Sequence, residues 1–168
     1  QRRVIFQVGT ATDQTSSNEC HAMRDRWIDF ESQVSGKPVR LHALWLGHVD
    51  AAAPVMLYLH GAGWDVRGSA QRMQLLHSLG FAVLGIDYRG FGRTSAEVPS
   101  EQMACEDASA AWRWLAVQHP LCKRYVYGHS LGGAIAVQLA AQIDDAAGLI
   151  VEGTFTSIPE LYDTLAWS

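Results

Sequence analysis

Four short, continuous hydrophobic runs stand out along the chain and predict buried strands. They lie at residues 55–59, 81–86, 125–127 and 148–151. None of them alternates hydrophobic with polar positions, which is typical of strands covered on both faces of a parallel sheet. We therefore expect these runs to form the centre of one sheet.

Two earlier segments do alternate hydrophobic and polar positions, as a half-buried strand does. They are residues 27–34 and 39–45, and Ser35-Gly36-Lys37-Pro38 between them has the composition of a turn. The two segments are expected to pair as a hairpin. In the second strand, the residues expected to share the hydrophobic face are Val39, Leu41, Ala43 and Trp45.

Helical spacing of hydrophobic residues fills the gaps between the predicted strands. A helix is expected over residues 69–79 and a second over residues 100–118, with Ser100 as its N-cap. A third, residues 131–143, is hydrophobic nearly all round and should be buried. Alternating strands and helices predict an α/β fold, a three-layer α/β/α sandwich with a mainly parallel sheet.

Length and composition fit a single globular domain. The chain has 168 residues, of which 48% are hydrophobic and 18% charged, and domains hold roughly 100–200 residues. We interpret the polar residues 1–24 as an irregular lead-in and residues 25–168 as the domain. The net charge is −4, without a long run of one sign, which argues against a nucleic-acid partner.

Cysteine spacing and hydrophobic run length say little about compartment. Cys20, Cys105 and Cys122 match no metal or redox pattern, so structural thiols and no metal site are expected. No hydrophobic run approaches the ~20 residues of a membrane span, and no signal peptide is visible. Because the chain starts at Gln1 without Met, the location stays open between cytoplasmic and membrane-associated.

The sequence GHSLG at residues 128–132 carries the main chemical signal. It fits G-x-S-x-G, between a predicted strand and a predicted helix. Ser130 at the tip of such a turn has a strained backbone, and side chains at Gly128 and Gly132 would collide. The turn presents the hydroxyl beyond the carboxyl ends of the strands, where open α/β sheets bind ligands. We predict Ser130 as a nucleophile; the alternative is a glycine-rich turn that only allows close helix packing.

His60-Gly61-Ala62-Gly63 directly follows the predicted strand at residues 55–59. An oxyanion hole needs two backbone donors aimed at one point. We expect the Leu131 N–H to be one donor and the Ala62 N–H the other, with Gly63 as second choice. The alternative is an ordinary strand-to-helix loop.

A third motif, DYRGFG, occupies residues 87–92 after another predicted strand. Its acidic and basic side chains are interpreted as structural. Asp87 is expected to accept backbone hydrogen bonds, and Arg89 is expected to brace a neighbouring segment.

In this order, the three motifs resemble the α/β-hydrolase superfamily over about residues 27–158. EGTFTSI at residues 152–158 resembles the E-x-x-F-T-S stretch of Bem46-like and serine-aminopeptidase-like hydrolases, and HGAG at residues 60–63 is similar to the oxyanion loop of monoacylglycerol lipases. The resemblance implies acyl transfer: Ser130 attacks a small-molecule ester, amide or thioester, and water releases the acid from an acyl-enzyme. It implies no cofactor.

The chain departs from the family order of serine, acid and histidine. None of its seven histidines follows Ser130, so the chain is expected to be C-terminally incomplete, to lack the last strands of the fold and, when isolated, to be nearly inactive. Glu152 is placed like the triad acid of some lipases, but its relatives use a later carboxylate. We expect association through the missing portion or an exposed sheet edge.

Other functions remain open at this stage. A binding or scaffold module would keep the fold without catalysis, although the retained elbow favours an enzyme. Haloperoxidase or dehalogenase chemistry occurs on the same fold, but a dehalogenase has aspartate at the elbow instead of Ser130. Trp64 and Trp167 suggest a hydrophobic acyl pocket, with ordinary core positions as the alternative.

Overall fold

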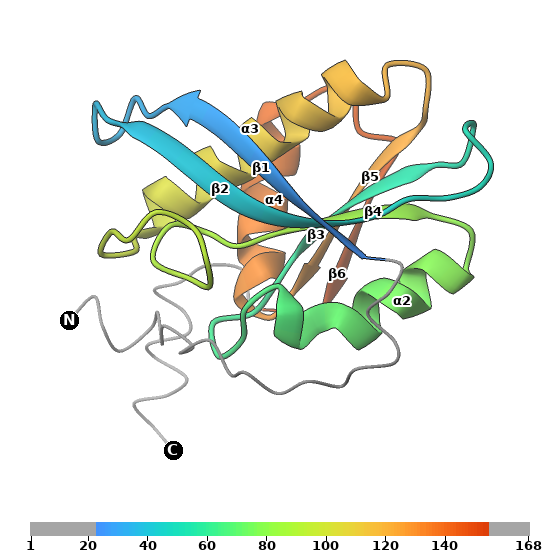
Figure 1. Cartoon of the computed structure of the whole chain (residues 1–168), viewed down its shortest axis with the longest axis horizontal. Helices are drawn as coiled ribbons and strands as arrows, with labels where there is room; N and C mark the ends of the chain where they lie inside the picture. Colours follow the sequence, from blue (N-terminus) through green and yellow to red (C-terminus); the bar gives the residue numbers. More distant parts are fainter. Residues whose placement is uncertain (1–22, 155–168) are drawn as a thin grey trace.

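The computed structural model describes residues 23–154, in which six strands form one sheet and helices lie on both of its faces (Figure 1). The strand order is β1-β2-β4-β3-β5-β6. The elements are β1 (Arg24–Glu31), β2 (Pro38–Leu46), β3 (Val55–Leu59), η2 (Arg67–Ser69), α2 (Ala70–Ser78), β4 (Ala82–Ile86), α3 (Glu101–Gln118), β5 (Arg124–His129), α4 (Leu131–Gln142) and β6 (Gly148–Glu152).

The sheet is mainly parallel, as the hydrophobic runs predict. Strands β4, β3, β5 and β6 are parallel neighbours, while β1 and β2 form the predicted antiparallel hairpin and β2 also pairs antiparallel with β4. In the β3–β5 pair, Leu59 stands opposite Gly128. The loop after β3 and the turn after β5 therefore start side by side at the same edge of the sheet.

Helices cover the sheet in the predicted three-layer arrangement (Figure 1). On one face α2 buries Met73 and Leu76. On the other face α3 and α4 pack against the sheet through residues such as Ala108 and Ile135. The predicted cap is confirmed, because the Ser100 hydroxyl accepts the Met103 N–H at 3.2 Å.

The first strand lies three residues earlier than predicted. The pattern suggested residues 27–34, but β1 ends at Glu31. After it the chain turns toward α3, where the Glu106 carboxylate accepts the backbone N–H of Gln33 at 2.5 Å and of Val34 at 3.3 Å. These amides are therefore satisfied by a side chain and not by a neighbouring strand.

The prediction that β2 is half-buried is wrong for its second half. Val39, Leu41 and Ala43 are buried, and so are His42, Leu44 and Leu46 on the opposite face. Leu44 and Leu46 belong to the hydrophobic cluster that α2 covers. Because β2 lies inside the sheet between β1 and β4, both of its faces are covered here.

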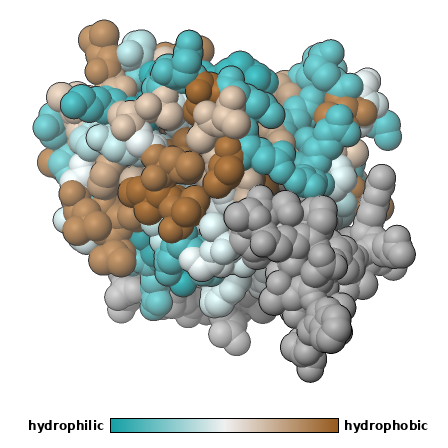
Figure 2. All heavy atoms as spheres, turned by 180° about the vertical axis from the view of Figure 1, so that it is seen from behind, coloured by the Kyte–Doolittle hydropathy of each residue, from teal (hydrophilic) through white to brown (hydrophobic). Residues whose placement is uncertain are grey.

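Strand β6 is less buried than its hydrophobic sequence predicts. Leu149, Ile150 and Val151 keep exposed fractions of 40%, 41% and 44%, because β6 is the last strand of the described sheet and pairs only with β5. The equally hydrophobic α4 also leaves Val137 40% exposed. Seen from behind, the molecule carries hydrophobic side chains gathered in one patch (Figure 2).

Candidate active site

Ser130 occupies a strained turn between β5 and α4. Its φ is 53° and its ψ −119°, and it is the one non-glycine residue with positive φ in the described part of the chain. Its N–H donates to the Glu152 carbonyl at 2.9 Å, and its carbonyl accepts the Thr154 hydroxyl at 2.7 Å and the Gly133 N–H at 2.9 Å. The surroundings thus hold a conformation that L residues rarely adopt.

The two elbow glycines stand where no side chain fits. A Cβ atom on Gly128 would overlap the carbonyl group of Gly132. A Cβ atom on Gly132 would overlap the carbonyl group of Leu59 at the end of β3. The first helical turn of α4 can therefore approach both its own strand and the neighbouring one.

The loop after β3 contacts the elbow directly. A Cβ atom placed on Gly61 would lie 3.2 Å from the Ser130 Cβ and 3.4 Å from the His129 Nδ1. The Leu131 N–H, in the first turn of α4, has no acceptor within the helix. Within residues 23–154, the backbone hydrogen bonds of loops and caps include none donated by Ala62 or Leu131. Among the described residues, neither amide therefore has a backbone acceptor, and both stay the predicted donors.

No histidine of the described chain is hydrogen-bonded to Ser130. His129 is half-buried and adjacent to it; burial lowers the pKa of His129, as does the Arg72 charge, while Glu152 opposes the shift. His42 and His60 are fully buried and engaged elsewhere. Among residues 23–154, no histidine side chain is therefore hydrogen-bonded to the serine.

Glu152 is held in a polar cluster of its own. Its two carboxylate oxygens accept Arg72 Nη1 at 2.7 and 2.6 Å, and the Tyr127 hydroxyl also donates to it. These hydrogen bonds lower the pKa of Glu152, while burial and the carboxylate raise the pKa of Tyr127 to about 12. Glu152 is therefore satisfied by arginine and tyrosine, which favours a later carboxylate as the triad acid. Sequence analysis missed both partners, since Arg72 is 80 residues away.

The DYRGFG motif is structural, as predicted. Asp87 accepts the Val66 N–H at 2.7 Å. Arg89 is fully buried; its guanidinium donates to Asp107 at 2.8 Å and to Glu106 at 2.6 Å on α3, and to Ser32 at 2.8 Å. Arg89 therefore braces α3 against the end of the β1–β2 hairpin.

His42 is a buried residue that sequence analysis placed among the polar positions of its strand. Its Nδ1 lies 2.9 Å from Asp87 Oδ2, and its Nε2 lies 2.6 Å from Asp25 Oδ1. The sequence signal was the two-residue alternation along the strand. It places His42 on the same face as the hydrophobic Leu44 and Leu46, which are also buried.

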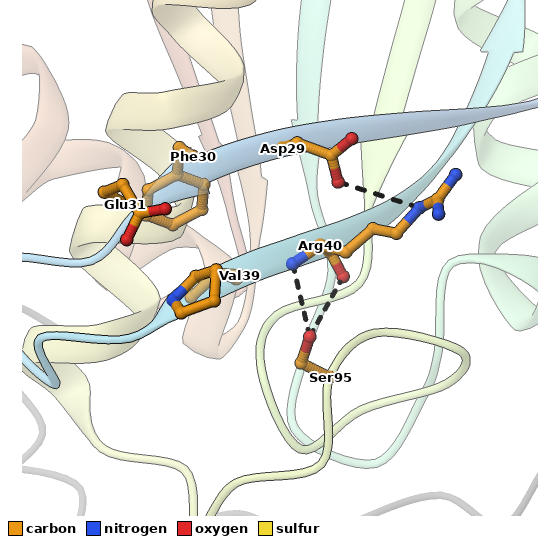
Figure 3. A pocket seen from close by; sticks show the side chains of 7 residues that line it. Asp29, Phe30, Glu31, Val39, Arg40 and Ser95 are labelled. Atoms are coloured by element: carbon orange, nitrogen blue, oxygen red, sulfur yellow. Dashed lines mark hydrogen bonds and ion pairs between the residues drawn. The ribbon is translucent and has the colours of Figure 1, made fainter.

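Two surface hollows lie away from the elbow. The first, of about 360 Å³, lies on the β1–β2 hairpin, where Asp29, Val39, Arg40 and Ser95 are among its walls (Figure 3). The second, of about 850 Å³, lies between the hairpin turn and helices α3 and α4. Trp64, in the loop after β3, is 56% exposed and so is not a core residue, and Trp167 lies outside the described residues.

Residues 23–154 contain neither a candidate metal site nor a helix that could span a membrane. This part of the chain contains no group of histidine, cysteine and carboxylate side chains that could hold a metal ion. None of its helices combines the length and the hydrophobicity that a bilayer crossing requires. Cys105 and Cys122 are free thiols.

Comparison with known families gives a match over most of the chain. A family profile described as serine aminopeptidase, S33, matches residues 50–167. An uncharacterized protein of Mycobacterium tuberculosis H37Rv is 34% identical over 164 residues, which cover 96% of this chain and 56% of that protein. The chain thus spans about half the length of this relative.

Two further relatives carry names. Lysophosphatidylserine lipase ABHD12 of Danio rerio is 40% identical over 114 residues, covering 64% of this chain and 29% of that protein. Protein bem46 of Schizosaccharomyces pombe is 35% identical over 117 residues, covering 67% and 38%. Both matches confirm the expected resemblance to Bem46-like hydrolases.

A solved structure shows the same fold. A thermostable carboxyl esterase from Bacillus coagulans superimposes with a TM-score of 0.68 at 24% identity, covering 87% of this chain and 49% of that one. At this identity the likeness concerns the fold alone. The predicted α/β-hydrolase architecture is confirmed, and the strands described here correspond to part of the longer chain.

Proposed function

Because this chain belongs to the serine aminopeptidase S33 family of α/β-hydrolases, we propose that it supplies the nucleophile and the oxyanion hole of a serine hydrolase. In the complete protein, Ser130 attacks the carbonyl carbon of an ester, amide or thioester, and the leaving group departs from an acyl-enzyme that water then hydrolyses. No cofactor takes part in this scheme.

The observation that carries the proposal is the geometry of the elbow. Ser130 combines a positive φ of 53° with a neighbouring loop so close that a Cβ on Gly61 would lie 3.2 Å from the Ser130 Cβ. A turn that serves only for helix packing gains nothing from this strain. The Ala62 and Leu131 amides beside the serine support its role, since backbone donors stabilise the negative charge of a tetrahedral intermediate.

The proton from the Ser130 hydroxyl goes to a base outside the described residues. Within residues 23–154 no histidine bonds to this hydroxyl, and Glu152 is occupied by Arg72 and Tyr127. We therefore propose that the isolated 168-residue chain is nearly inactive, with only the residual catalysis that backbone donors provide.

The substrate class is proposed from the names of relatives. Lysophosphatidylserine lipase and carboxyl esterase are names of proteins similar to this chain, and both act on carboxylic esters. An ester is therefore the first substrate to test, and an amide, suggested by the family name of serine aminopeptidase, is the second.

A fluorophosphonate probe tests the proposal on the complete natural chain. The wild-type protein should gain one covalent adduct at Ser130, detected by intact mass and peptide mapping. Ser130→Ala should abolish labelling, and Ser109→Ala, a matched change on α3, should leave it unchanged. If Ser130 stays unlabelled in the complete, folded protein, the hydrolase proposal fails and the fold serves as a binding or scaffold module.

Association through the edge of the sheet stays a prediction. It is supported by Leu149, Ile150 and Val151, each at least 40% exposed on β6. Size-exclusion chromatography with light scattering, comparing the isolated chain with Ile150→Lys, tests it: the wild type should elute as a larger species than the variant. Equal monomeric masses would contradict the prediction.

A further inference from the structure

A histidine enclosed between two carboxylates lies behind the loop after β3. His42 has no exposed surface; its Nδ1 is 2.9 Å from Asp87 Oδ2 and its Nε2 is 2.6 Å from Asp25 Oδ1. A carboxylate oxygen can only accept, so a proton on Nδ1 lets the ring donate to the buried Asp87. A buried carboxylate needs such a donor.

The second oxygen of Asp87 faces the loop that contacts Ser130. Asp87 Oδ1 accepts the Val66 N–H at 2.7 Å and lies 3.7 Å from His60 Nε2. Val66 follows the loop, and His60 precedes it. The carboxylate that His42 holds therefore contacts the residues at both ends of the loop formed by residues 61–65.

His60 fixes the first peptide group of that loop. Its Nδ1 lies 2.8 Å from the Gly61 carbonyl oxygen, and its ring is packed against Tyr88 and Phe91 at centroid distances of 4.6 and 5.3 Å. Complete burial lowers the pKa of His60, and the charge of Asp87 and the Gly61 hydrogen bond oppose this shift only in part. The Gly61 carbonyl oxygen can only accept, so His60 Nδ1 carries a proton that is directed at it.

The orientation of the Gly61 carbonyl sets the direction of the Ala62 N–H. The two groups belong to one planar trans peptide, in which C=O and N–H point in opposite directions. Because the oxygen is held toward the buried His60, the N–H points away from it. The chain of contacts from His42 through Asp87 and His60 thus ends at the amide that we assign to the oxyanion hole.

We propose that His42 is a positioning residue: by holding the Asp87 carboxylate, it keeps the Ala62 amide directed at the oxyanion. The role of this amide toward an oxyanion rests on the proposed function, but the orientation of the loop does not. The two sides of His42 are unequal. Asp25 is 44% exposed and shared with Arg67 at 3.2 Å and Arg93 at 3.4 Å, whereas the Asp87 side chain is 2% exposed.

A matched pair of variants separates the two sides. The amide nitrogen of Asn can take the place of Nδ1 and still donate to Asp87, whereas that of Gln reaches the place of Nε2 and donates to Asp25. In the full chain, NMR would follow hydrogen exchange of the Val66 amide, the Ala62 amide shift and the imidazole nitrogens of His60. His77→Gln, at a half-buried histidine bonded to the Gly47 carbonyl, is the control.

His42→Asn should keep Val66 exchange within about threefold of the wild type and leave the Ala62 shift in place. His42→Gln should accelerate Val66 exchange at least tenfold, move the Ala62 signal and disturb the His60 tautomer. The reason is that this variant loses the buried hydrogen bond to Asp87. Equal effects of both variants, or the larger effect in the Asn variant, would overturn the proposal, since a residue that merely packs would not distinguish them.

The wild-type spectrum gives a test that needs no variant. The proposal requires His42 to carry a proton on Nδ1, facing Asp87, and His60 to carry a proton on Nδ1, facing Gly61; an unprotonated Nδ1 on either ring refutes it. These measurements do not depend on turnover. Ser130 that stays unlabelled beside an intact contact chain would refute the hydrolase proposal and leave the loop-orienting role of His42 standing.

Discussion

Replacing Ser130 by glycine should make the protein more stable than replacing it by alanine. Both changes remove the hydroxyl, so their difference reports only the backbone. At φ 53° and ψ −119°, alanine keeps a strain of about 1–3 kcal/mol, which glycine relieves. Glycine loses more chain entropy on folding, by roughly 0.5–1 kcal/mol relative to alanine. The two ranges combine to a net advantage of about 0–2.5 kcal/mol for Ser130→Gly.

Urea unfolding followed by tryptophan fluorescence and circular dichroism measures this difference. For a chain of this size, each kcal/mol corresponds to roughly 2–4 °C in Tm, so a thermal scan should agree in sign. The same pair of substitutions at Ser109 inside α3 is the control. There the backbone is helical, and glycine should be less stable than alanine by about 1 kcal/mol.

One result would refute the reasoning outright. If Ser130→Ala is more stable than Ser130→Gly by about the same margin as at Ser109, the turn stores no strain. The conformation of Ser130 would then no longer distinguish a nucleophile elbow from a turn that only packs a helix.

Three further predictions follow from the same contacts. Gly132→Ala should destabilise the protein by at least about 2 kcal/mol, measured by urea unfolding, because its Cβ overlaps the Leu59 carbonyl; unchanged stability would contradict the close approach. Arg89→Ala should cost about 3–5 kcal/mol, whereas Arg40→Ala, at a solvent-exposed ion pair, should cost under about 1 kcal/mol; equal losses would refute the bracing role. Hydrogen bonds lower the folded-state pKa of Glu152, so its stabilisation is present above its ordinary pKa of 4.5 and is lost as pH falls through the lower folded value. Urea midpoints should therefore decline below pH 4.5, and less steeply in Glu152→Gln.

Local sequence patterns predicted the strands and helices, because strands and helices bury hydrophobic residues at different spacings along the chain. The continuous run at residues 55–59 became β3 with every residue buried, and Ser100 capped α3 as its position indicated. Boundaries set by distant side chains were not visible. β1 ends at Glu31, and the amides of Gln33 and Val34 beyond it are accepted by Glu106, some 70 residues later.

The candidate site divides in the same way. The strain at Ser130 and the crowding at Gly128 could be predicted from the sequence, because both depend on one contiguous motif between a strand and a helix. His42, Arg72 and Tyr127 could not be assigned, because each acquires its role from a carboxylate that only the folded sheet brings near. The spacing of hydrophobic residues predicts which face of an element is buried, but not which side chains from other elements contact that face.

The conformation of Ser130 depends on a strand that is synthesised after it. Its amide and its carbonyl are both tied to the stretch that ends β6, through Glu152 and Thr154. On the ribosome, residue 130 is synthesised more than twenty positions before those partners. The hydrogen bonds that hold its backbone conformation therefore cannot yet form. Ser130 would therefore adopt its positive φ only when β6 docks, and a growing polypeptide would carry this residue in an ordinary conformation until that moment.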